Sequence, residues 1–238
     1  MADNRRHWDS LGAQYSENWA SVSQQLLSEQ ETSFLLRHLP APPGQSVLDV
    51  GIGSGRILDK LIAQEGVAAV YGVDISPEMV DVCRARFAGE PKLRGLFVCD
   101  VSREPLPVPP NLDFISAVRM LKYSRNWGEM IETLLGHLAP DGVLVFSMPN
   151  ENSIKRFSRP YAVEYFKTSA KDLRARLQRP DLELLEVTGF SKMPDLLYRR
   201  GHHPRVASGL VGLERALDAA IGPAALAREL FVAVRRKG

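Results

Sequence analysis

The sequence predicts an α/β fold built around a mostly parallel β-sheet, and three observations support this class. Short β-branched and apolar runs alternate with segments of helical periodicity from residue 46 onward, which is typical of βαβ units with right-handed crossovers. The first of these runs passes directly into a glycine-rich turn at residues 51–55. The chain has 238 residues, of which 45% are hydrophobic and 24% charged, and this is enough for one well-buried domain.

Strands and helices are expected in alternation along the chain. Residues 1–40 read as helical, because Trp8, Leu11 and Tyr15, and later Phe34 and Leu35, provide apolar faces. This segment either packs on a sheet edge or covers the site as a lid. Strands are expected at 46–50, 68–74, 93–99, 112–118, 142–148, 182–190 and 229–236, and helices at 54–64, 77–88, 125–138, 169–178 and 206–222. The proline-rich residues 102–111 and residues 191–205 are expected to be loops.

The glycine-rich turn is the first candidate binding element. Residues 47–55 read VLDVGIGSG, an apolar strand followed by glycines at alternate positions. Gly51, Gly53 and Gly55 can adopt backbone angles closed to other residues, and they allow a ligand to lie against the main chain. The next segment has helical periodicity, so the loop opens onto a helix N-terminus whose N–H groups point toward a bound ligand. The alternative is a tight βα turn of the kind found in any α/β protein.

The spacing of the glycines separates this loop from two phosphate-binding loops. A dinucleotide fingerprint requires a glycine where this chain has Arg56, and a P-loop requires a Gly-Lys-Ser/Thr sequence that is missing here. Asp49 would repel a pyrophosphate but suits a ligand that carries positive charge. The sequence therefore predicts a cationic nucleoside. A nicotinamide-dependent reductase is disfavoured by the same spacing, and also because no tyrosine is followed four residues later by a lysine.

Four stretches in order resemble the motifs of class I S-adenosylmethionine-dependent methyltransferases. They are VLDVGIGSG at 47–55, YGVDIS at 71–76, VCDV at 98–101 and LAPDGVLV at 138–145. The resemblance implies a Rossmann-like three-layer sandwich with a seven-stranded sheet, whose last strand is antiparallel and lies beside the sixth. It implies S-adenosyl-L-methionine as cofactor and S-adenosyl-L-homocysteine as product. One domain, 1–238, would comprise a helical cap (1–40), a cofactor-binding core (41–149) and an acceptor-side lid with the last strands (150–238).

The strand ends supply the expected cofactor contacts, because ligands of open parallel sheets lie at the carboxyl ends of the strands. Asp74 ends the second strand, where its carboxylate suits both ribose hydroxyls. The alternative is a helix N-cap, a role that Ser76 can fill. The resemblance implies that Asp100 accepts a hydrogen bond from the adenine amino group. Further cofactor contacts are expected from the glycine loop and from Tyr15, Asp49, Ile75, Met79, Val101 and Val118, with core packing as the alternative for Met79.

The catalytic group is less well defined by the sequence. Small-molecule relatives place a histidine shortly after the fourth strand, and this chain has Tyr123 roughly at that position. If the acceptor atom is a hydroxyl oxygen, a general base must take its proton. The candidates are Tyr123, His202 and His203, and the pKa range of histidine suits the task. The alternative for the two histidines is a solvated pair in an arginine-rich loop.

The expected acceptor is a small hydroxylated metabolite or sugar that carries a carboxylate or phosphate. Basic residues gather in 155–176 and 192–205, interleaved with aromatic residues at 157–166, and such a mixture suits an aromatic pocket with an anion-binding rim. A solvated face is the alternative. An N- or C-methyltransferase of a natural-product pathway and a non-catalytic cofactor-binding module stay open. No metal is expected, because carboxylates do not follow the fourth and fifth strands, and the net charge of +2 gives no pull toward nucleic acid.

The remaining composition bears on location and assembly. Cys83 and Cys99 lie in apolar segments, which favours reduced, buried thiols and a cytoplasmic protein. The N-terminus lacks an apolar signal core and no run approaches a membrane-spanning length, so no membrane association is expected. Both a monomer and a homodimer are compatible with the sequence.

Overall fold

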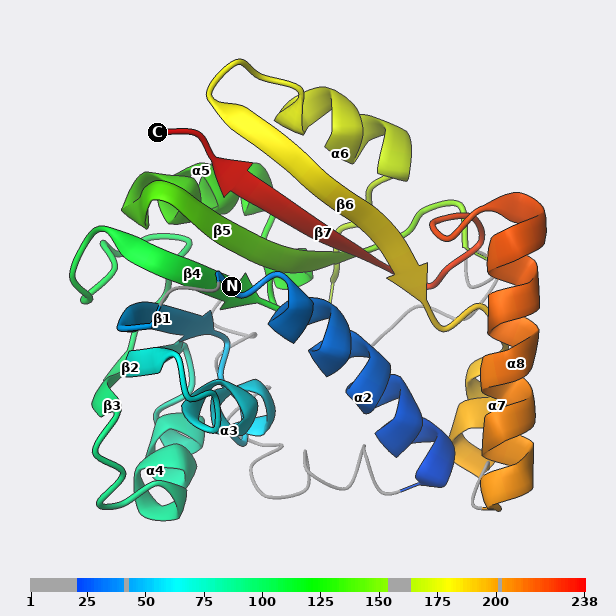
Figure 1. The fold of residues 1–238 in the computed structure, drawn as a ribbon, viewed down its shortest axis with the longest axis horizontal. Coiled ribbons are helices and arrows are strands. Elements are labelled where there is room, and N and C mark those ends of the chain that lie inside the picture. Colours follow the sequence, from blue (N-terminus) through cyan, green and yellow to red (C-terminus); the bar gives the residue numbers. More distant parts are fainter. Residues whose placement is uncertain (1–20, 41–42, 154–163, 201–202) are drawn as a thin grey trace.

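The computed structural model describes residues 21–40, 43–153, 164–200 and 203–238. The strands are β1 (Gln45–Val50), β2 (Val67–Asp74), β3 (Leu93–Val98), β4 (Leu112–Ala117), β5 (Leu138–Pro149), β6 (Leu182–Phe190) and β7 (Glu229–Arg236). They form one seven-stranded sheet in the order β3-β2-β1-β4-β5-β7-β6 (Figure 1). β7 lies between β5 and β6 and is antiparallel to both, whereas the other pairs are parallel. The expected mostly parallel sheet with an antiparallel last strand is confirmed.

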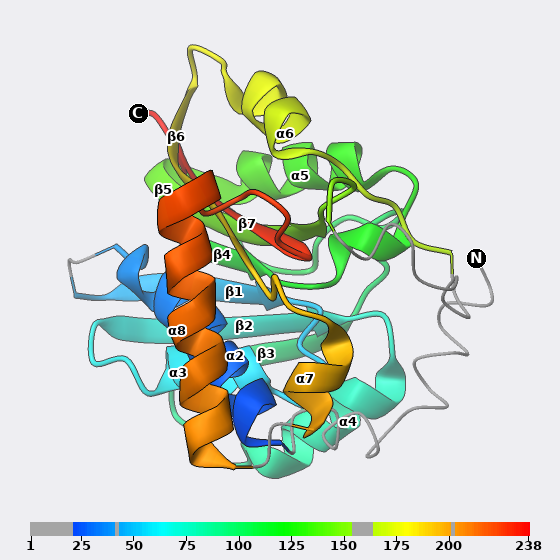
Figure 2. The same cartoon turned by 90° about the vertical axis from the view of Figure 1, so that its right-hand side faces the viewer.

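Helices cover both faces of this sheet and give three layers (Figures 1 and 2). One face carries α2 (Val22–Arg37), α3 (Arg56–Ile62) and α4 (Pro77–Arg86), and the other carries α5 (Trp127–His137) and α6 (Ala170–Leu177). Leu58 and Val80 belong to the core under the first layer, and Leu134 and Leu173 belong to the core under the second. The expected three-layer sandwich is therefore confirmed.

Helix α2 is fixed to the rest of the fold at both ends. Ser21 is its N-cap and forms a capping box with Gln24, and the Ser21 hydroxyl also donates to the carbonyl oxygen of Tyr198 at 2.6 Å. Phe34, near the other end, is fully buried, and its ring lies 5.7 Å from that of Phe231 in β7. The helix thus packs across the sheet. Tyr15, expected to reach the cofactor from the preceding segment, lies outside the described residues.

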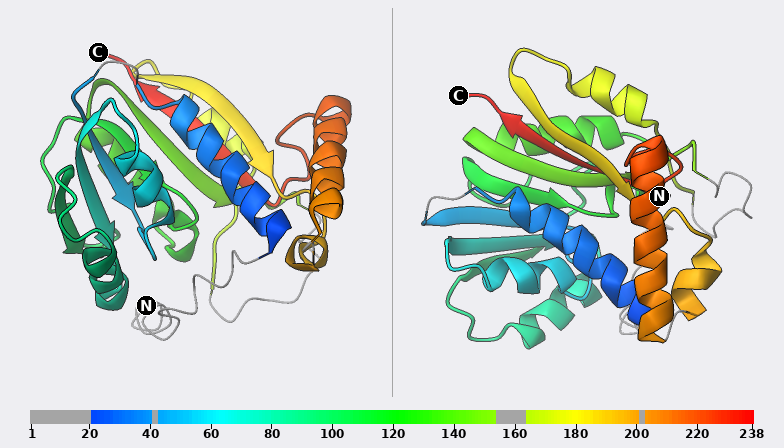
Figure 3. Two further views of the ribbon diagram at one scale, coloured as in Figure 1. Left: turned by 60° about the horizontal axis from the view of Figure 1, so that its bottom comes forward. Right: turned by 45° about the vertical axis from the view of Figure 1, so that its right-hand side comes forward.

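Two further helices stand beyond the sheet, next to the N-terminal part of α2 (Figure 3). They are α7 (Asp195–Arg200) and α8 (Pro204–Ile221), so the expectation of a loop over 191–205 was wrong for most of that segment. The start of α8 follows from its first residues, because His203 is the N-cap and proline at the first helical position is already set to a helical φ. Within the described residues, no helix is both long and apolar enough to cross a membrane.

Candidate active site

A cavity opens at the carboxyl ends of β1, β2, β3 and β4. In the sheet, β1 lies between β2 and β4, so the cavity sits where the strand order reverses, the usual ligand position in open α/β sheets. Eight of the residues expected to bind the cofactor line this cavity: Gly51, Gly53, Asp74, Ile75, Met79, Asp100, Val101 and Val118. The predicted catalytic Tyr123 lines it as well.

The glycine loop leaves no room for side chains at two positions. A Cβ atom at Gly51, where φ is 77°, would lie 2.7 Å from Cβ of Met120. A Cβ at Gly55, where φ is 84°, would lie 2.6 Å from the ring of Phe87. Gly55 is the N-cap of α3, which begins at Arg56, two residues later than the sequence predicted. Gly55 does not belong to the cavity lining. The loop backbone therefore packs against the segment after β4 on one side and against α4 on the other.

Asp74 braces the glycine loop from the end of β2. One carboxylate oxygen accepts from the N–H of Gly53 at 2.9 Å, and the other accepts from the N–H of Ser76 at 2.9 Å. Ser76, not Asp74, caps α4, because its hydroxyl accepts from the N–H of Met79. Carboxylate oxygens each accept more than one hydrogen bond, so the geometry that holds the loop also leaves Asp74 able to meet a diol in the cavity.

Asp49 was expected to contact a cationic ligand, but its side chain does not line the cavity. Side chains alternate between the two faces of a strand, so Val50 points into the cavity while Asp49 points toward α3. The Asp49 carboxyl is 1% exposed and accepts from the hydroxyl of Ser116 at 2.6 Å and from the N–H of Leu58. Burial raises the pKa of Asp49 to about 7. The residue therefore joins β1 to β4 and to the start of α3, and it does not line the cavity.

Asp100 stands at the opposite rim, after β3. One of its carboxylate oxygens accepts from the N–H of Ser102 at 3.1 Å and from the Ser102 hydroxyl at 2.6 Å, so a local turn sets its orientation. The apolar floor between the two carboxylates includes Met79, which is 2% exposed, and Val101, which is 7% exposed. This half of the cavity therefore combines two oriented carboxylates with an apolar surface.

The proposed bases are separated by the fold. Tyr123 ends the short 3₁₀ helix η2 (Leu121–Tyr123) at the cavity, and Nζ of Lys122 lies 5.4 Å from its ring centroid. His203 is an exposed N-cap of α8, where its ring accepts from the N–H of Arg205, and it is absent from the lining. His202 lies outside the part of the chain that the structure describes. Of the three, Tyr123 is the residue that the described structure brings to the site.

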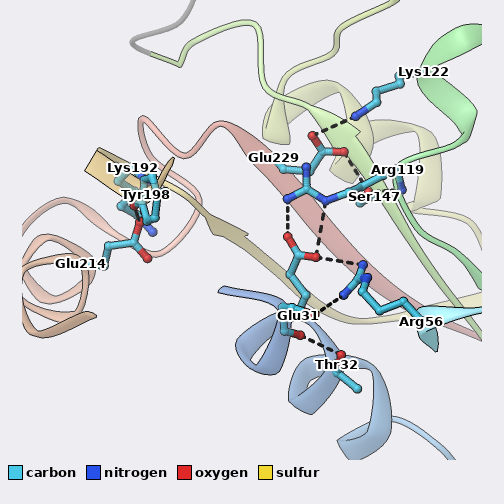
Figure 4. A network of polar contacts seen from close by, with 11 residues as sticks. Glu31, Thr32, Arg56, Arg119, Lys122, Ser147, Lys192, Tyr198, Glu214 and Glu229 are labelled. Carbon is cyan, nitrogen blue, oxygen red and sulfur yellow. Dashed lines mark hydrogen bonds and ion pairs between the residues drawn. The ribbon is translucent and has the colours of Figure 1, made fainter. Parts of the chain in front are cut away.

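Arg119 is a lining residue that the sequence did not single out (Figure 4). Its guanidinium pairs with the carboxylate of Glu31 in α2, whose side chain is 1% exposed. Arg56, the first residue of α3, reaches the same carboxylate at 3.2 Å. A charged residue after a strand gives no sequence signal for such pairing, because its partners lie far away in the chain.

A second buried carboxylate stands behind Arg119 (Figure 4). Glu229, at the start of β7, accepts from the hydroxyl of Ser147 at 2.9 Å and lies 3.6 Å from Nζ of Lys122. Burial alone would raise the pKa of Glu229, but the charges of Lys122, Arg119 and Arg228 and the hydrogen bond from Ser147 together hold that pKa below its ordinary value. The β4 side of the cavity is therefore backed by ionised, buried groups.

Sequence comparisons point to one family. A family profile described as a methyltransferase domain matches residues 23–187. The chain is 33% identical over 116 residues to a trans-aconitate 2-methyltransferase of Methylobacterium nodulans, and the match covers 49% of this chain and 43% of that protein. It is 28% identical over 129 residues to a ubiquinone biosynthesis O-methyltransferase of Neisseria meningitidis, with 51% of each chain covered. These matches span about half the length of the curated relatives.

Comparison with solved structures finds proteins of similar fold. An S-adenosylmethionine-dependent methyltransferase from Mesorhizobium loti superposes with a TM-score of 0.62 at 19% identity, covering 86% of this chain and 96% of that one. At this level of identity the likeness concerns the arrangement of strands and helices. It agrees with the seven-stranded sheet.

Proposed function

The chain belongs to the family of class I S-adenosylmethionine-dependent methyltransferases, and from this membership we propose that it transfers the methyl group of S-adenosylmethionine to an oxygen atom of a small-molecule acceptor. The observation that carries the proposal is the cavity itself, which brings Gly51, Asp74 and Asp100 together at the strand-order reversal. Two relatives support the acceptor class, since their names specify trans-aconitate and an O-methylation in ubiquinone biosynthesis.

The residues present fit the cofactor. Gly51 and Gly53 line the cavity with main chain alone, because neither carries a side chain. Asp74 is assigned to the ribose hydroxyls and Asp100 to the adenine amino group, and the apolar floor is assigned to the adenine ring, with Ile75, Met79, Val101 and Val118. Asp49 contributes indirectly, by joining β1 to Ser116 of β4 and to Leu58 of α3.

The chemistry places few demands on the protein. When bound, S-adenosylmethionine supplies a methyl group activated by a sulfonium, so the chain needs no covalent nucleophile. What the chain provides is a fixed approach of the acceptor oxygen and exclusion of water, and positioning of this kind accounts for a large part of such rate enhancements. We assign to Tyr123 the hydrogen bond that orients the acceptor oxygen at the cavity wall and, where that oxygen is a hydroxyl, the role of the general base that takes its proton.

Three regions of the chain follow from this assignment. Residues 41–149 would bind the cofactor, residues 150–238 would cover the acceptor, and residues 1–40 would cap the site. We expect the reaction to occur in the cytoplasm, because Cys83 and Cys99 are buried free thiols and burial raises their pKa values to about 12 and about 11.

Calorimetry tests the proposal directly. S-adenosylmethionine should bind and NAD should not, and Asp74→Ala should weaken the first affinity about 10- to 100-fold by loss of charged hydrogen bonds. Asp81→Ala, which removes a 70% exposed carboxylate from α4, is the matched control and should leave the affinity unchanged. Isotopically labelled S-adenosylmethionine incubated with metabolite pools should then yield a labelled product by mass spectrometry. Cofactor binding with no labelled product from any pool would favour a non-catalytic module.

A further inference from the structure

We propose that Asn126 is a positioning residue that sets the preference of the site for the adenine base, a role that rests on the methyl-transfer function proposed above. Its side chain joins two segments that line the cavity. One follows β3 and carries Asp100 and Ser102, and the other follows β4 and carries Ser124. Two strands, β2 and β1, separate β3 from β4 in the sheet. Asn126 therefore connects parts of the cavity wall that the sheet holds apart.

The side-chain amide of Asn126 uses both of its ends in this connection. Its Nδ2 donates to the carbonyl oxygen of Ser102 at 2.9 Å, and its Oδ1 accepts from the hydroxyl of Ser124. The orientation of an amide follows from its hydrogen-bond partners. The opposite orientation would place Oδ1 against the carbonyl oxygen of Ser102, and two acceptors cannot form a hydrogen bond. The partners therefore define one orientation of the amide.

Asn126 does not use its side chain to cap the helix that it precedes. It is the N-cap residue of α5, yet its side chain makes no capping hydrogen bond. An asparagine at this position ordinarily accepts from an N–H of the first turn and stabilises the helix. Nδ2 also lies 3.4 Å from Oε2 of Glu129, but the carbonyl oxygen of Ser102 is the nearer partner. The side chain is therefore directed to the cavity wall and not to its own helix.

The segment that Asn126 holds is the one that orients Asp100. The N–H groups of Arg103 and Glu104 donate to the carbonyl oxygen of Asp100 at 2.9 and 2.8 Å, which closes a tight turn. Within this turn, the hydroxyl and the N–H of Ser102 donate to Oδ1 of the Asp100 carboxylate at 2.6 and 3.1 Å. The carbonyl oxygen of the same Ser102 is the acceptor for Asn126. Ser102 therefore links the position of Asn126 to that of the Asp100 carboxylate.

Base selectivity is the property that depends most directly on this arrangement. The carboxylate assigned to the adenine amino group accepts a hydrogen bond there, whereas hypoxanthine carries a carbonyl oxygen in place of that amino group. A site built around one hydrogen bond rejects an analogue that lacks the donor, and such a bond requires a defined distance and direction. The apolar floor, by contrast, meets two rings of nearly the same shape. A shift of Asp100 should therefore reduce the preference for adenine and leave the apolar contacts in place.

Two probes that differ in the base test the proposal. S-adenosylhomocysteine and S-inosylhomocysteine, which carry an amino group and an oxygen at the same ring position, are titrated by calorimetry into the full chain. The wild type should bind the adenine compound about 10- to 100-fold more tightly, as expected for a charged hydrogen bond. Asp100→Ala should abolish this preference, because it removes the carboxylate itself.

Two substitutions of Asn126 should each reduce the preference at least fivefold. Asn126→Asp keeps the shape of the side chain but places a carboxylate against the carbonyl oxygen of Ser102. Asn126→Ser is too short to reach that oxygen, and serine is a preferred N-cap residue, so α5 should keep its stability in thermal unfolding. Gln64→Glu is the matched control, because its amide also donates to a backbone carbonyl, that of Lys60 at 2.9 Å, but Gln64 does not line the cavity. It should retain the preference.

Several outcomes would overturn the proposal and leave methyl transfer in place. They are equal binding of the two compounds by the wild type, a preference that survives in D100A, and a preference that survives in N126S. An equal loss of affinity for both compounds in N126S would also overturn it, because Asn126 would then only support the fold. If N126D does not fold, N126S alone decides. Failure of the wild type to bind S-adenosylhomocysteine would instead remove the proposed function.

Discussion

Replacing Glu31 by Gln should destabilise the fold far more than a surface substitution of the same kind. The Glu31 side chain is 1% exposed and pairs with both Arg56 and Arg119. Gln has nearly the same volume, so the change removes charge and leaves packing in place. Both guanidinium groups would then lose their shared buried carboxylate.

The magnitude follows from the exposure of the partners. Breaking a buried ion pair from one side costs about 3–5 kcal/mol. The arginine side chains are 22% and 14% exposed, so water recovers part of this loss, and we expect about 3 kcal/mol. With a denaturant slope of about 3 kcal/mol/M, the urea midpoint should fall by about 1 M.

Equilibrium urea unfolding measures this shift, and Glu186→Gln is the matched control. Glu186 also meets two residues of the α2 region, the guanidinium of Arg37 at 2.5 Å and the ring of His38 at 3.0 Å, but its side chain is 34% exposed. Its loss should cost less than about 1 kcal/mol. Equal midpoints for E31Q and E186Q would refute the view that the Glu31 network is a buried, stabilising ion pair.

Three further substitutions test other parts of the structure. The folded protein binds a proton on Asp49 more tightly than the unfolded chain does, because burial raises this pKa from 3.8 to about 7; the stability from this proton is therefore complete below pH 4 and is lost as pH rises to about 7. The whole loss amounts to about 4 kcal/mol, of which about 3 kcal/mol falls between pH 5 and pH 8. Asp49→Asn should remove this part of the pH dependence when urea midpoints at pH 5 and pH 8 are compared with those of the wild type. Gly51→Ala forces a Cβ to within 2.7 Å of Met120 at a φ of 77°, so it should lower S-adenosylmethionine affinity at least tenfold in calorimetry, whereas Gly136→Ala, where a Cβ meets nothing within 4 Å, should not. Ser76→Ala removes the N-cap of α4 and should cost about 1 kcal/mol in thermal unfolding, and an unchanged melting temperature would count against that cap.

The sequence was sufficient where local pattern and packing agree. The strands end within a few residues of their expected positions, because β-branched runs bounded by glycine, proline and charged residues can form few other structures. Asp74 and Asp100 reach one cavity because each directly follows or ends a parallel strand. A binding site made by residues at strand ends can therefore be predicted from the sequence alone.

Other features depend on contacts between distant parts of the chain. The position of Asp49 follows from strand alternation once the register of β1 is known, yet its partner Ser116 belongs to another strand. The pairing of Glu31 with Arg119 requires α2 to cross the sheet, and nothing local to either residue indicates that path. The helices within 191–205 were missed because the segment has too little periodicity to outweigh its turn-forming residues.

The insertion of β7 between β5 and β6 has a consequence for the order of assembly. A ribosome delivers β7 after every other strand, so β6 has no hydrogen-bonded neighbour in the sheet until β7 arrives. Pairings across such long sequence separations are slow to form, and the half of the protein from β1 to β5 can take shape beforehand. Because Glu229 begins β7 and holds Ser147, the nucleoside half of the cavity would mature first, and the wall around Arg119 would be completed only in the final folding step.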